Sequence, residues 1–574
     1  MNHIFLRKHH KWFGIPLCFL IIMFCFSGII LNHRTLVADI NVDRGLLPSA
    51  YRYSDWNNGI FRGTLRLHNG EASNSVLIYG NNGIWRYDSG SVTDFNAGLP
   101  SGVDYRNIKG MTITSGGEIF AASMFGLYRY HYSDSGPDSD SDSGFDSEWQ
   151  YWVPLNSQIH DDEKLTDICM IGDTLVVLGR SYVYRSLPPY HNFERIELKA
   201  PEGYDGKVSL FKTVWMLHSG ELFGLAGKIF VDLIGLLLSL ICITGLVFWL
   251  LPKYMRYKRK SLKDNFSPHL RKAGKTVKYS LLIHDRLGRY TFPVLLFLVI
   301  TGWSLRPPVL LALVFSESRP VPYTKLDSSN PWNDKLRMLR YDSSQGDWIL
   351  STSDGFFTFR SFDDVPLKIE KTPPVSVMGL NVFQKENTSK SNTVCGGDII
   401  GKNITEMQDS ALCNRKAYEV ETEGEWIVGS FSGLYRWNRE KGTVTDYFTG
   451  DEVEDVSGPP FGKYAVAGYS EDFTPCDLSK KVLSSSLKTS AEQENQKVYS
   501  TYKPLIVEYY GGTDLLPMPE DFSCLPISLW NLALEIHTGR IYTFLGDGTL
   551  FYIFFAGLAS IWCLFTGWKV RKKK

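Results

Sequence analysis

The sequence lacks an excess of either charge, because its 574 residues contain 61 Lys and Arg against 61 Asp and Glu. A nucleic-acid-binding protein is usually basic, so this balance argues against that class of protein. The composition of a disordered chain is absent too, since 44% of the residues are hydrophobic. Cysteine is scarce, with nine residues, and no Cys-x-x-Cys-His motif occurs. Covalent attachment of a c-type haem is therefore not expected.

Motifs for soluble cofactors and for hydrolysis are missing as well. The sequence has no Gly-rich dinucleotide motif, and the basic stretch 253–283 is too short to hold a flavin or nicotinamide domain. Gly274-Lys-Thr276 lacks the earlier glycine of a phosphate-binding loop, because His269 occupies that position. No Ser-His-Asp or metalloprotease pattern is found. We therefore expect no NAD, flavin or nucleotide site.

Long apolar runs are abundant, and four of them are long enough to cross a membrane as helices. They lie at about 12–31, 229–251, 290–315 and 541–568. The first could instead be a signal peptide, but its run exceeds the usual apolar length and no small-x-small cleavage site follows it. The sequence therefore predicts a multi-pass membrane protein that contacts the lipid bilayer through four transmembrane helices.

Lys and Arg gather before the first run, between the second and third, and after the fourth. This distribution predicts that both termini face the cytoplasm of a bacterial inner membrane and that the two long segments face the periplasm. The predicted segments are 1–33 (helix with a cytoplasmic N-terminus), 34–216 (periplasmic, β-rich), 217–252 (helix), 253–283 (basic cytoplasmic loop), 284–315 (helix), 316–535 (periplasmic, β-rich) and 536–574 (helix with a cytoplasmic C-terminus). Zero net charge is thus a cancellation across a membrane.

The apolar runs form an internal repeat in which the second pair of helices repeats the first. The matched positions are His10 with His284, Gly14 with Gly288, Ser27-Gly28 with Thr301-Gly302, His218 with His537, and Thr244-Gly245 with Thr566-Gly567. His10 and His284 fall at the cytoplasmic ends of their spans, and His218 and His537 fall at the outer ends. The duplicated unit therefore carries one histidine for each of its two helices.

Two levels of histidine in a four-helix bundle are the geometry for two axially ligated b-type haems. We expect His10 and His284 to ligate one haem and His218 and His537 the other. His33 also reaches the outer boundary and could replace one of the outer pair, although its counterpart in the repeat is Pro307. The neighbouring Gly and Ser or Thr would permit close approach of a helix or a flat macrocycle. A histidine at a membrane interface can also cap a helix or contact headgroups.

The order His-x-x-x-Gly, apolar span, Ser/Thr-Gly, outer segment, Leu/Ile-His-Ser/Thr-Gly, span and Thr-Gly resembles the PepSY-associated transmembrane family. That family includes bacterial inner-membrane ferric-siderophore reductases. The resemblance implies haem-mediated electron transfer toward a periplasmic acceptor such as a ferric chelate. It covers the four spans and their flanks only, and the outer segments differ from PepSY-type domains.

Both outer segments contain a recurring hairpin pattern, in which two strands are joined by a tight Gly-containing turn. The copies lie at 76–87, 117–130, 172–185, 346–359 and 424–437. They resemble the periplasmic propeller repeats of two-component-type sensors. One β-propeller of six to eight blades assembled from both segments is expected, with an irregular β-sandwich as the alternative. The acidic stretch 133–148 lacks the Gly and Glu spacing of a calcium loop and is expected to be solvated.

Five cysteines lie in the outer segments, where oxidising conditions would permit disulfides. On proximity alone we favour Cys395–Cys413 and Cys476–Cys524, although three pairings of these four exist. Cys169 would then be a buried free thiol. The carboxylates Asp232 and Asp547 lie near the outer ends of their spans, where hydration competes with a functional role.

Two hypotheses about function follow. The first is a dihaem b-type membrane protein, a ferric reductase or related transmembrane oxidoreductase, that takes electrons from quinol or a protein donor and passes them outward. The second is a non-enzymatic membrane-anchored receptor or sensor whose propeller binds a ligand. The repeated histidines favour the first, and the missing electron-input motif favours the second.

Overall fold

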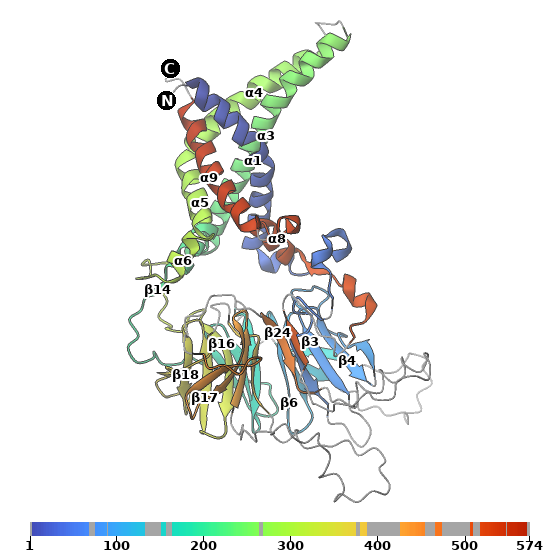
Figure 1. Cartoon of the computed structure of the whole chain (residues 1–574), viewed down its shortest axis with the longest axis vertical. Helices are drawn as coiled ribbons and strands as arrows, with labels where there is room; N and C mark the ends of the chain where they lie inside the picture. The colour runs from blue at the N-terminus through green and yellow to red at the C-terminus, as the bar shows by residue number, and fades with distance from the viewer. Residues whose placement is uncertain are drawn as a thin grey trace, which may run out of the picture. The chain divides into compact units, whose positions relative to one another are not determined.

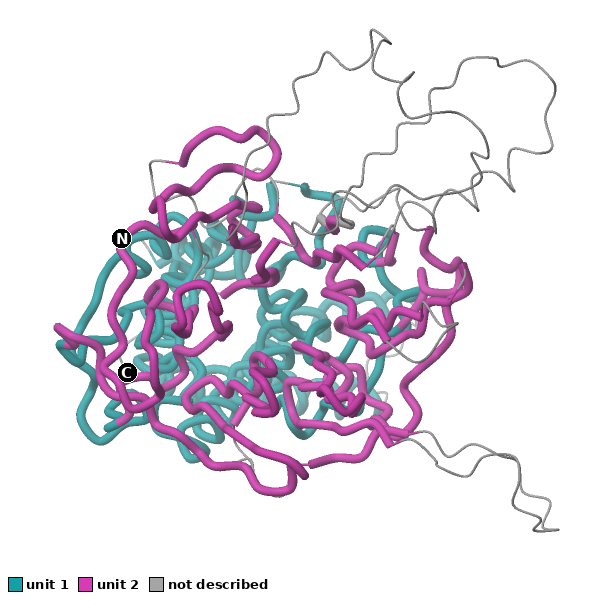
Figure 2. The backbone as a smooth tube through the Cα atoms, turned by 90° about the horizontal axis from the view of Figure 1, so that it is seen from below, with its two compact units in different colours: residues 1–51, 205–329, 526–574 teal, residues 52–204, 330–525 magenta. Residues whose placement is uncertain are grey.

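The computed structural model describes residues 3–54, 56–67, 75–88, 90–131, 151–155, 163–262, 268–374, 379–386, 425–453, 465–472, 505–508, 517–546 and 548–570. Contacts divide the chain into two compact units (Figure 2). Unit 1 comprises residues 1–51, 205–329 and 526–574 and contains the long helices. Unit 2 comprises residues 52–204 and 330–525 and contains the larger sheets. Both long outer segments therefore contribute to one β-rich unit.

Three helical stretches of unit 1 are long and apolar enough to cross a membrane. They are α1 (His3–Asn32), the stretch Glu221–Lys260 that holds most of α3 (Gly224–Leu262), and α9 (Gly548–Lys569). In unit 1, α1 lies against both α3 and α9 (Figure 1). This protein is therefore a membrane protein with several apolar helices.

The third predicted span is built differently from the other three. Predicted at about 290–315, it begins where α4 (Pro268–Tyr290) ends and contains α5 (Phe292–Ser304). α4 and α5 are long and apolar enough to cross a membrane only together, and they are bent by 69° at their junction. The described residues thus contain three candidate spans, or up to four if the bent pair is one span. α5 ends before Pro307 and Pro308, which lack backbone N–H donors, and α6 (Val309–Val314) follows.

The basic stretch expected to be a cytoplasmic loop is mostly helical. α3 continues to Leu262 and α4 begins at Pro268, and the two helices pack against each other over much of their length (Figure 1). His284, expected at the end of a span, therefore lies on α4. Over most of 253–283 the backbone groups are therefore satisfied within helices.

Two short helices, α2 (Leu210–Ser219) and α8 (Leu529–Thr538), precede α3 and α9. Each ends at a glycine in the left-handed region, Gly220 and Gly539, both with φ of 78°. A Cβ atom at Gly220 would lie 2.2 Å from the backbone oxygen of Gly227, so no side chain fits in this turn. The turns let α2 pack on α5 and α8 pack on α1.

Unit 2 contains, among the described residues, five antiparallel sheets of four strands each, in which the strands follow sequence order. Their strands are β2 (Gly63–Arg66), β3 (Val76–Gly80), β4 (Gly83–Asp88) and β5 (Ser91–Asp94); β6 (Ile108–Ile113), β7 (Ile119–Ser123), β8 (Gly126–His131) and β9 (Tyr151–Pro154); β10 (Leu165–Ile171), β11 (Thr174–Gly179), β12 (Val183–Ser186) and β13 (Glu194–Ile196); β16 (Leu336–Asp342), β17 (Asp347–Thr352), β18 (Gly355–Phe359) and β19 (Leu367–Lys368); and β20 (Val382–Lys385), β21 (Glu425–Ser430), β22 (Gly433–Asn438) and β23 (Thr443–Asp446).

A sixth sheet of unit 2 has two described strands, β24 (Val466–Ser470) and β25 (Leu505–Glu508). The two remaining pairs belong to unit 1 and join β1 (Asn41–Val42) to β26 (Ile527–Ser528) and β14 (Val208–Ser209) to β15 (Glu317–Ser318). β1 follows α1 and pairs with β26, which precedes α8; β15 follows α6 and pairs with β14, which precedes α2. The ends of unit 1 segments are thereby fixed to each other by backbone hydrogen bonds.

All five predicted hairpins are confirmed, and each forms the two middle strands of a four-stranded sheet. In the clearest copy, β7 and β8 pair with Ser123 opposite Gly126. The repeated aromatic residues are core residues, as expected: Tyr128 is 3% exposed and Trp437 is fully buried. The pattern of alternating apolar residues therefore located the strands because each hairpin is buried between two neighbouring sheets.

The sheets of unit 2 follow one another in a closed circle (Figure 2). The first strands of neighbouring sheets contact each other in the order β2, β6, β10, β16, β20 and β24, and β24 contacts β2 again. At this closure the hydroxyl oxygens of Thr64 and Ser470 are 2.5 Å apart, and Arg66 forms an ion pair with Asp472 at 3.6 Å. Each of the two chain segments supplies three consecutive sheets.

A buried charge network joins the β16–β19 sheet to the β20–β23 sheet. Arg439, which is 6% exposed, donates to Asp342 and to Asp347, both at 2.8 Å. Asp342 also accepts from Lys385 at 3.1 Å and from Ser344 at 2.6 Å. Burial alone would raise the pKa of Asp342, but these three hydrogen-bond donors outweigh it and lower the pKa to about 2.

Replacing Arg439 by Met should lower the free energy of unfolding of unit 2 by about 3–5 kcal/mol, because two buried carboxylates lose their shared cation. The measurement is denaturant unfolding of the full-length protein in detergent, followed by the β-sheet circular dichroism signal. Arg185→Met is the matched control, since Arg185 and its partner Glu194 are exposed. Exposed pairs contribute about 0–1 kcal/mol. Equal losses in the two variants would contradict the role given to the network.

The same network predicts acid sensitivity. Because the pKa of Asp342 is lower in the folded protein than its ordinary value of 3.8, the stabilisation is complete above about pH 4 and is lost as the pH falls toward 2. Unfolding midpoints measured between pH 5 and pH 2 should therefore fall more steeply for the wild type than for Asp342→Asn. If the unfolding midpoints of the two proteins fall equally between pH 5 and pH 2, Asp342 is not the cause of the acid sensitivity.

Candidate functional site

Four of the five sequence-predicted histidines come together in two pairs inside unit 1. The imidazole rings of His10 on α1 and His284 on α4 have their centroids 6.1 Å apart. The rings of His218 on α2 and His537 on α8 have their centroids 6.2 Å apart. These are the pairs that the sequence repeat predicted, and in each pair a histidine meets its own counterpart from the other repeat.

The two pairs have the separation that a shared axial metal requires. A metal–imidazole bond is about 2 Å long, so an iron atom between two ring nitrogens places the ring centroids about 6 Å apart. The two pairs also lie at different levels of the bundle. α1 carries His10 near one end and Gly28, which contacts His537, about 27 Å further along the helix axis.

Each of the four imidazoles is held by the same backbone hydrogen bond. The Nδ1 atoms of His10, His284, His218 and His537 lie within hydrogen-bond distance of the carbonyl oxygens of Cys563 (3.0 Å), Ile241 (2.9 Å), Leu298 (3.1 Å) and Phe24 (3.0 Å), respectively. A carbonyl oxygen can only accept, so Nδ1 carries the proton and Nε2 carries the lone pair of the neutral ring. This tautomer is the one in which Nε2 can ligate a metal.

A glycine stands four residues after each of these carbonyl groups, and the imidazole edge lies where its side chain would be. The distances from the ideal Cβ position to the nearest imidazole carbon, Cε1, are 3.2 Å from Gly28 to His537, 3.1 Å from Gly245 to His284, 2.7 Å from Gly302 to His218 and 2.8 Å from Gly567 to His10. In a helix, the side chain at i+4 lies over the carbonyl of residue i. Only glycine leaves that carbonyl open to an imidazole.

The Ser or Thr before each glycine completes the arrangement. The hydroxyl oxygens of Ser27, Thr244, Thr301 and Thr566 lie within hydrogen-bond distance of the carbonyl oxygens of Phe24 (3.1 Å), Ile241 (3.0 Å), Leu298 (3.0 Å) and Cys563 (3.0 Å), which are the same four that bind the histidines. The hydroxyl groups of Ser27 and Thr244 are closer to the preceding carbonyls, those of Met23 and Leu240, at 2.8 Å, and Thr301 is equally close to that of Phe297. The repeated Ser/Thr-Gly dipeptide is therefore a receptor for a histidine from a neighbouring helix. The sequence indicated close approach at these dipeptides but not which histidine each one receives.

His33 is not part of either pair. Its Nε2 atom lies 2.6 Å from the carboxylate of Asp232 on α3, and Asn32 donates to the same carboxylate at 2.9 Å. A histidine whose Nε2 faces a carboxylate differs from the four whose Nδ1 faces a carbonyl. Asp232 thus has a defined partner rather than bulk water alone. Asp547 lies outside the described residues.

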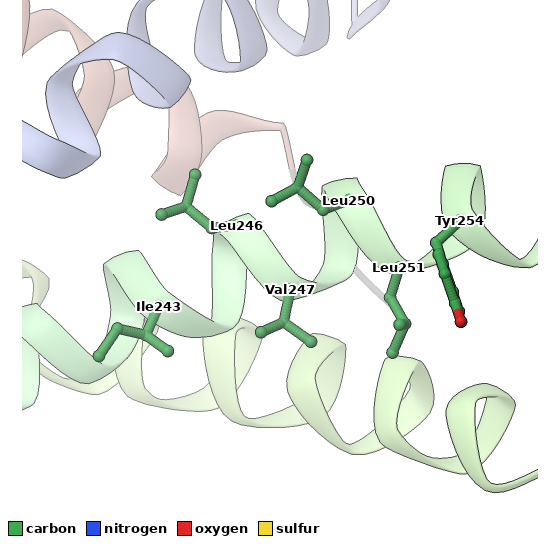
Figure 3. Close-up of a pocket in the computed structure, with 6 residues that line it drawn as sticks. All are labelled: Ile243, Leu246, Val247, Leu250, Leu251 and Tyr254. Atoms are coloured by element: carbon green, nitrogen blue, oxygen red, sulfur yellow. The ribbon is translucent and has the colours of Figure 1, made fainter. Parts of the chain in front are cut away.

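An apolar pocket of about 260 Å³ lies along α3, next to the glycine that receives His284 (Figure 3). It is lined by Ile243, Leu246, Val247, Leu250, Leu251 and Tyr254. Ile243 and Leu246 are the neighbours in sequence of Thr244-Gly245. Apolar lining is what a lipophilic group or an acyl chain requires.

The cysteines add no further ligand set among the described residues, where no three His, Cys, Asp or Glu converge on a point that could hold a metal ion. A haem that is ligated on both faces would need two protein ligands rather than three, so a pair of histidines would fit it. Cys169 on β10 is a half-buried free thiol whose pKa burial raises to about 12. Of the four cysteines expected in disulfides, Cys524 is exposed, and the other three lie outside the described residues.

Sequence reasoning did not identify Arg306. This residue lies in the turn after α5 and donates from Nη2 to the backbone oxygen of His537 at 3.2 Å. Arg306 lies one helical turn after Gly302 and directly before two prolines. That position could have indicated that it lies near the histidine bound at Gly302. A cation at the end of an apolar run normally marks only the membrane boundary, so the sequence does not separate the two roles.

Comparison with known proteins supports the predicted family resemblance of the helical segments, and it does not identify the fold of the sheets. No curated protein matches the sequence. Among solved structures, the chain is similar to the extracellular domain of a hybrid two component system from B. thetaiotaomicron, with 9% identity and a TM-score of 0.25. That match covers 75% of this chain and only 37% of the other chain. The family profile of the PepSY-associated TM region matches residues 3–251. This match supports the predicted resemblance over residues 3–251, which contain His10, Ser27-Gly28, His218 and Thr244-Gly245.

Proposed function

We propose that the protein binds two b-type haems, one between His10 and His284 and one between His218 and His537, and carries electrons across a membrane. The observation that carries this proposal is the repeated geometry of the two pairs, whose centroids are 6.1 and 6.2 Å apart. When bound, haem b supplies reversible one-electron chemistry. Two such groups at two levels of a bundle connect the two faces of a membrane.

The chain's own residues do the positioning. Each backbone carbonyl orients one imidazole and fixes its tautomer, and a Ser or Thr hydroxyl lies within hydrogen-bond distance of the same oxygen. Because these acceptors belong to the rigid helices α1, α3, α5 and α9, the histidines have little freedom to turn away. A metal ligand that is ordered before binding loses less entropy on binding.

For unit 2 we propose a six-bladed β-propeller with recognition as its role. Five sheets of four antiparallel strands and a sixth sheet follow each other in a closed circle among the described residues, which supports that architecture. A propeller assembled from both segments leaves one face and one central axis for a ligand. The acceptor recognised there would be a ferric chelate or a protein partner.

The distribution of Lys and Arg supports an orientation with both termini in the cytoplasm and unit 2 in the periplasm of a bacterial inner membrane. Electrons would then enter from quinol or a protein donor and leave toward a periplasmic acceptor. The alternative is a haem-free membrane-anchored receptor. The closed circle of sheets in unit 2 is the one observation that favours it. It does not account for four histidines held by one repeated hydrogen bond.

His284→Ala and His537→Ala should each remove about half of the haem absorbance, because each variant deletes one ligand of one pair. The measurement is the reduced-minus-oxidised spectrum near 560 nm of the detergent-purified protein, with haem counted per polypeptide. His33→Ala is the matched control and should keep the full spectrum, since His33 contacts Asp232 instead of another histidine. A colourless wild type from haem-supplemented cells would overturn the proposal and leave the receptor alternative.

The glycines give a graded test of the same geometry. Gly302→Ala and Gly567→Ala bring a Cβ within 2.7 and 2.8 Å of an imidazole and should weaken haem binding about tenfold, since such overlaps cost about 1–3 kcal/mol. Gly28→Ala and Gly245→Ala, at 3.2 and 3.1 Å, should have smaller effects.

The control for the graded series is Gly274→Ala on α4. The nearest atom to its Cβ position is the methyl carbon of Met255 at 3.8 Å, so this substitution adds a helix-favouring methyl group without touching a histidine. Haem affinity is measured by titrating apoprotein in detergent. Five variants with the same affinity would show that the glycines do not define the histidine positions.

A further inference from the structure

Arg306 connects the two halves of the His218–His537 pair. It follows Gly302, the glycine that receives His218, by one helical turn, so the two residues share a face of the chain leaving α5. Its Nη2 atom donates to the backbone oxygen of His537 at 3.2 Å. Arg306 thus follows α5, the helix whose carbonyl group binds His218, and its guanidinium group is hydrogen-bonded to the backbone of His537.

The positive charge of Arg306 has no counter-ion in the described part of the chain. No described carboxylate lies within ion-pair distance of it, and the side chain is half-buried. Arg540, a cation near the same end of α8, differs because it pairs with Glu535 at 2.5 Å.

A guanidinium group held in an apolar bundle without an anion is costly, because desolvation is not repaid. It also has five N–H donors, of which the bond to His537 uses one. Planar guanidinium donors match a carboxylate in bidentate geometry. The remaining donors of Arg306, beside the His218–His537 pair, are therefore of the kind that binds a carboxylate.

We propose that Arg306 binds a carboxylate of the group held between His218 and His537, which for haem b is a propionate, and that its charge makes this site easier to reduce. This inference rests on the proposed function. Reduction lowers the net charge of the bound group by one, so a fixed cation beside it favours the reduced form. The His218–His537 site then draws electrons toward its own end of the bundle.

The first experiment compares haem binding and redox titration of Arg306→Gln, Arg306→Lys and Arg540→Gln in detergent. Arg306→Gln should bind haem about tenfold to a hundredfold more weakly at one site and lower the midpoint potential of that site only, because a charge-assisted hydrogen bond is lost. Arg306→Lys should keep the potential close to that of the wild type but bind more weakly, since the charge stays and the fork is lost. Arg540→Gln should match the wild type.

The second experiment identifies the anion. Apoprotein is titrated with haem and with haem dimethyl ester, whose propionates carry no charge. The ester should bind wild type as weakly as haem binds Arg306→Gln, and Arg306→Gln should bind both forms equally. If Arg306→Gln weakens both forms to the same extent relative to wild type, the anion is not a propionate and the inference fails. Unchanged affinity and potential in Arg306→Gln, or equal effects in Arg540→Gln, also overturn it.

The outcomes for Arg306 are separable from those for the proposed function. A wild type that binds no haem from either titration overturns the proposed function. A wild type that binds two haems, with Arg306→Gln indistinguishable from it, overturns only the role of Arg306. If Arg306→Gln does not fold, the ester titration of wild type and of Arg306→Lys still decides, because it needs no loss of the side chain.

Discussion

An imidazole can reach a backbone carbonyl in the middle of a helix only where the residue one turn later has no side chain. That steric constraint organises unit 1. In the copy on α9, for example, the carbonyl oxygen of Cys563 lies within hydrogen-bond distance of the His10 Nδ1 atom and of the Thr566 hydroxyl. Four repeats of this arrangement fix four histidines, and they also fix which helices must be neighbours, because every histidine and its glycine come from different helices.

The two repeats of the chain also combine to form unit 2. Each repeat consists of a first span, a segment that supplies three sheets, a short histidine-bearing helix and a second span. The first span is α1 in one repeat and the bent pair of α4 and α5 in the other. The three sheets of one segment cannot close a circle alone, because β24 from the second segment contacts β2 from the first. The order of the sheets in the circle is the order of the sequence. The buried ion network around Arg439 joins two sheets that belong to the same segment.

The sequence was informative wherever a local pattern was repeated. The histidine positions, the Ser/Thr-Gly dipeptides and all five hairpins were predictable because each occurs more than once with the same spacing. The bend between α4 and α5 was not predicted. It falls at Thr291, at the start of the apolar run, and Pro293 in the first turn of α5 marks a helix start without giving the angle to the helix before it. For His33 the sequence position alone was ambiguous. It allowed His33 to be a ligand, but in the structure its Nε2 atom contacts Asp232, which is distant in sequence. Such partners depend on which helices pack together, and one sequence does not encode that in any local pattern.

In both pairs a histidine faces the equivalent residue of the other repeat, His10 facing His284 and His218 facing His537. Equivalent residues meet in this way at an isologous interface, where one surface contacts a copy of itself across a two-fold axis. A single repeat carries one half of each pair and cannot complete either one. Two identical copies of such a repeat would complete both, so the present chain has the internal symmetry of a homodimer whose subunits became covalently joined.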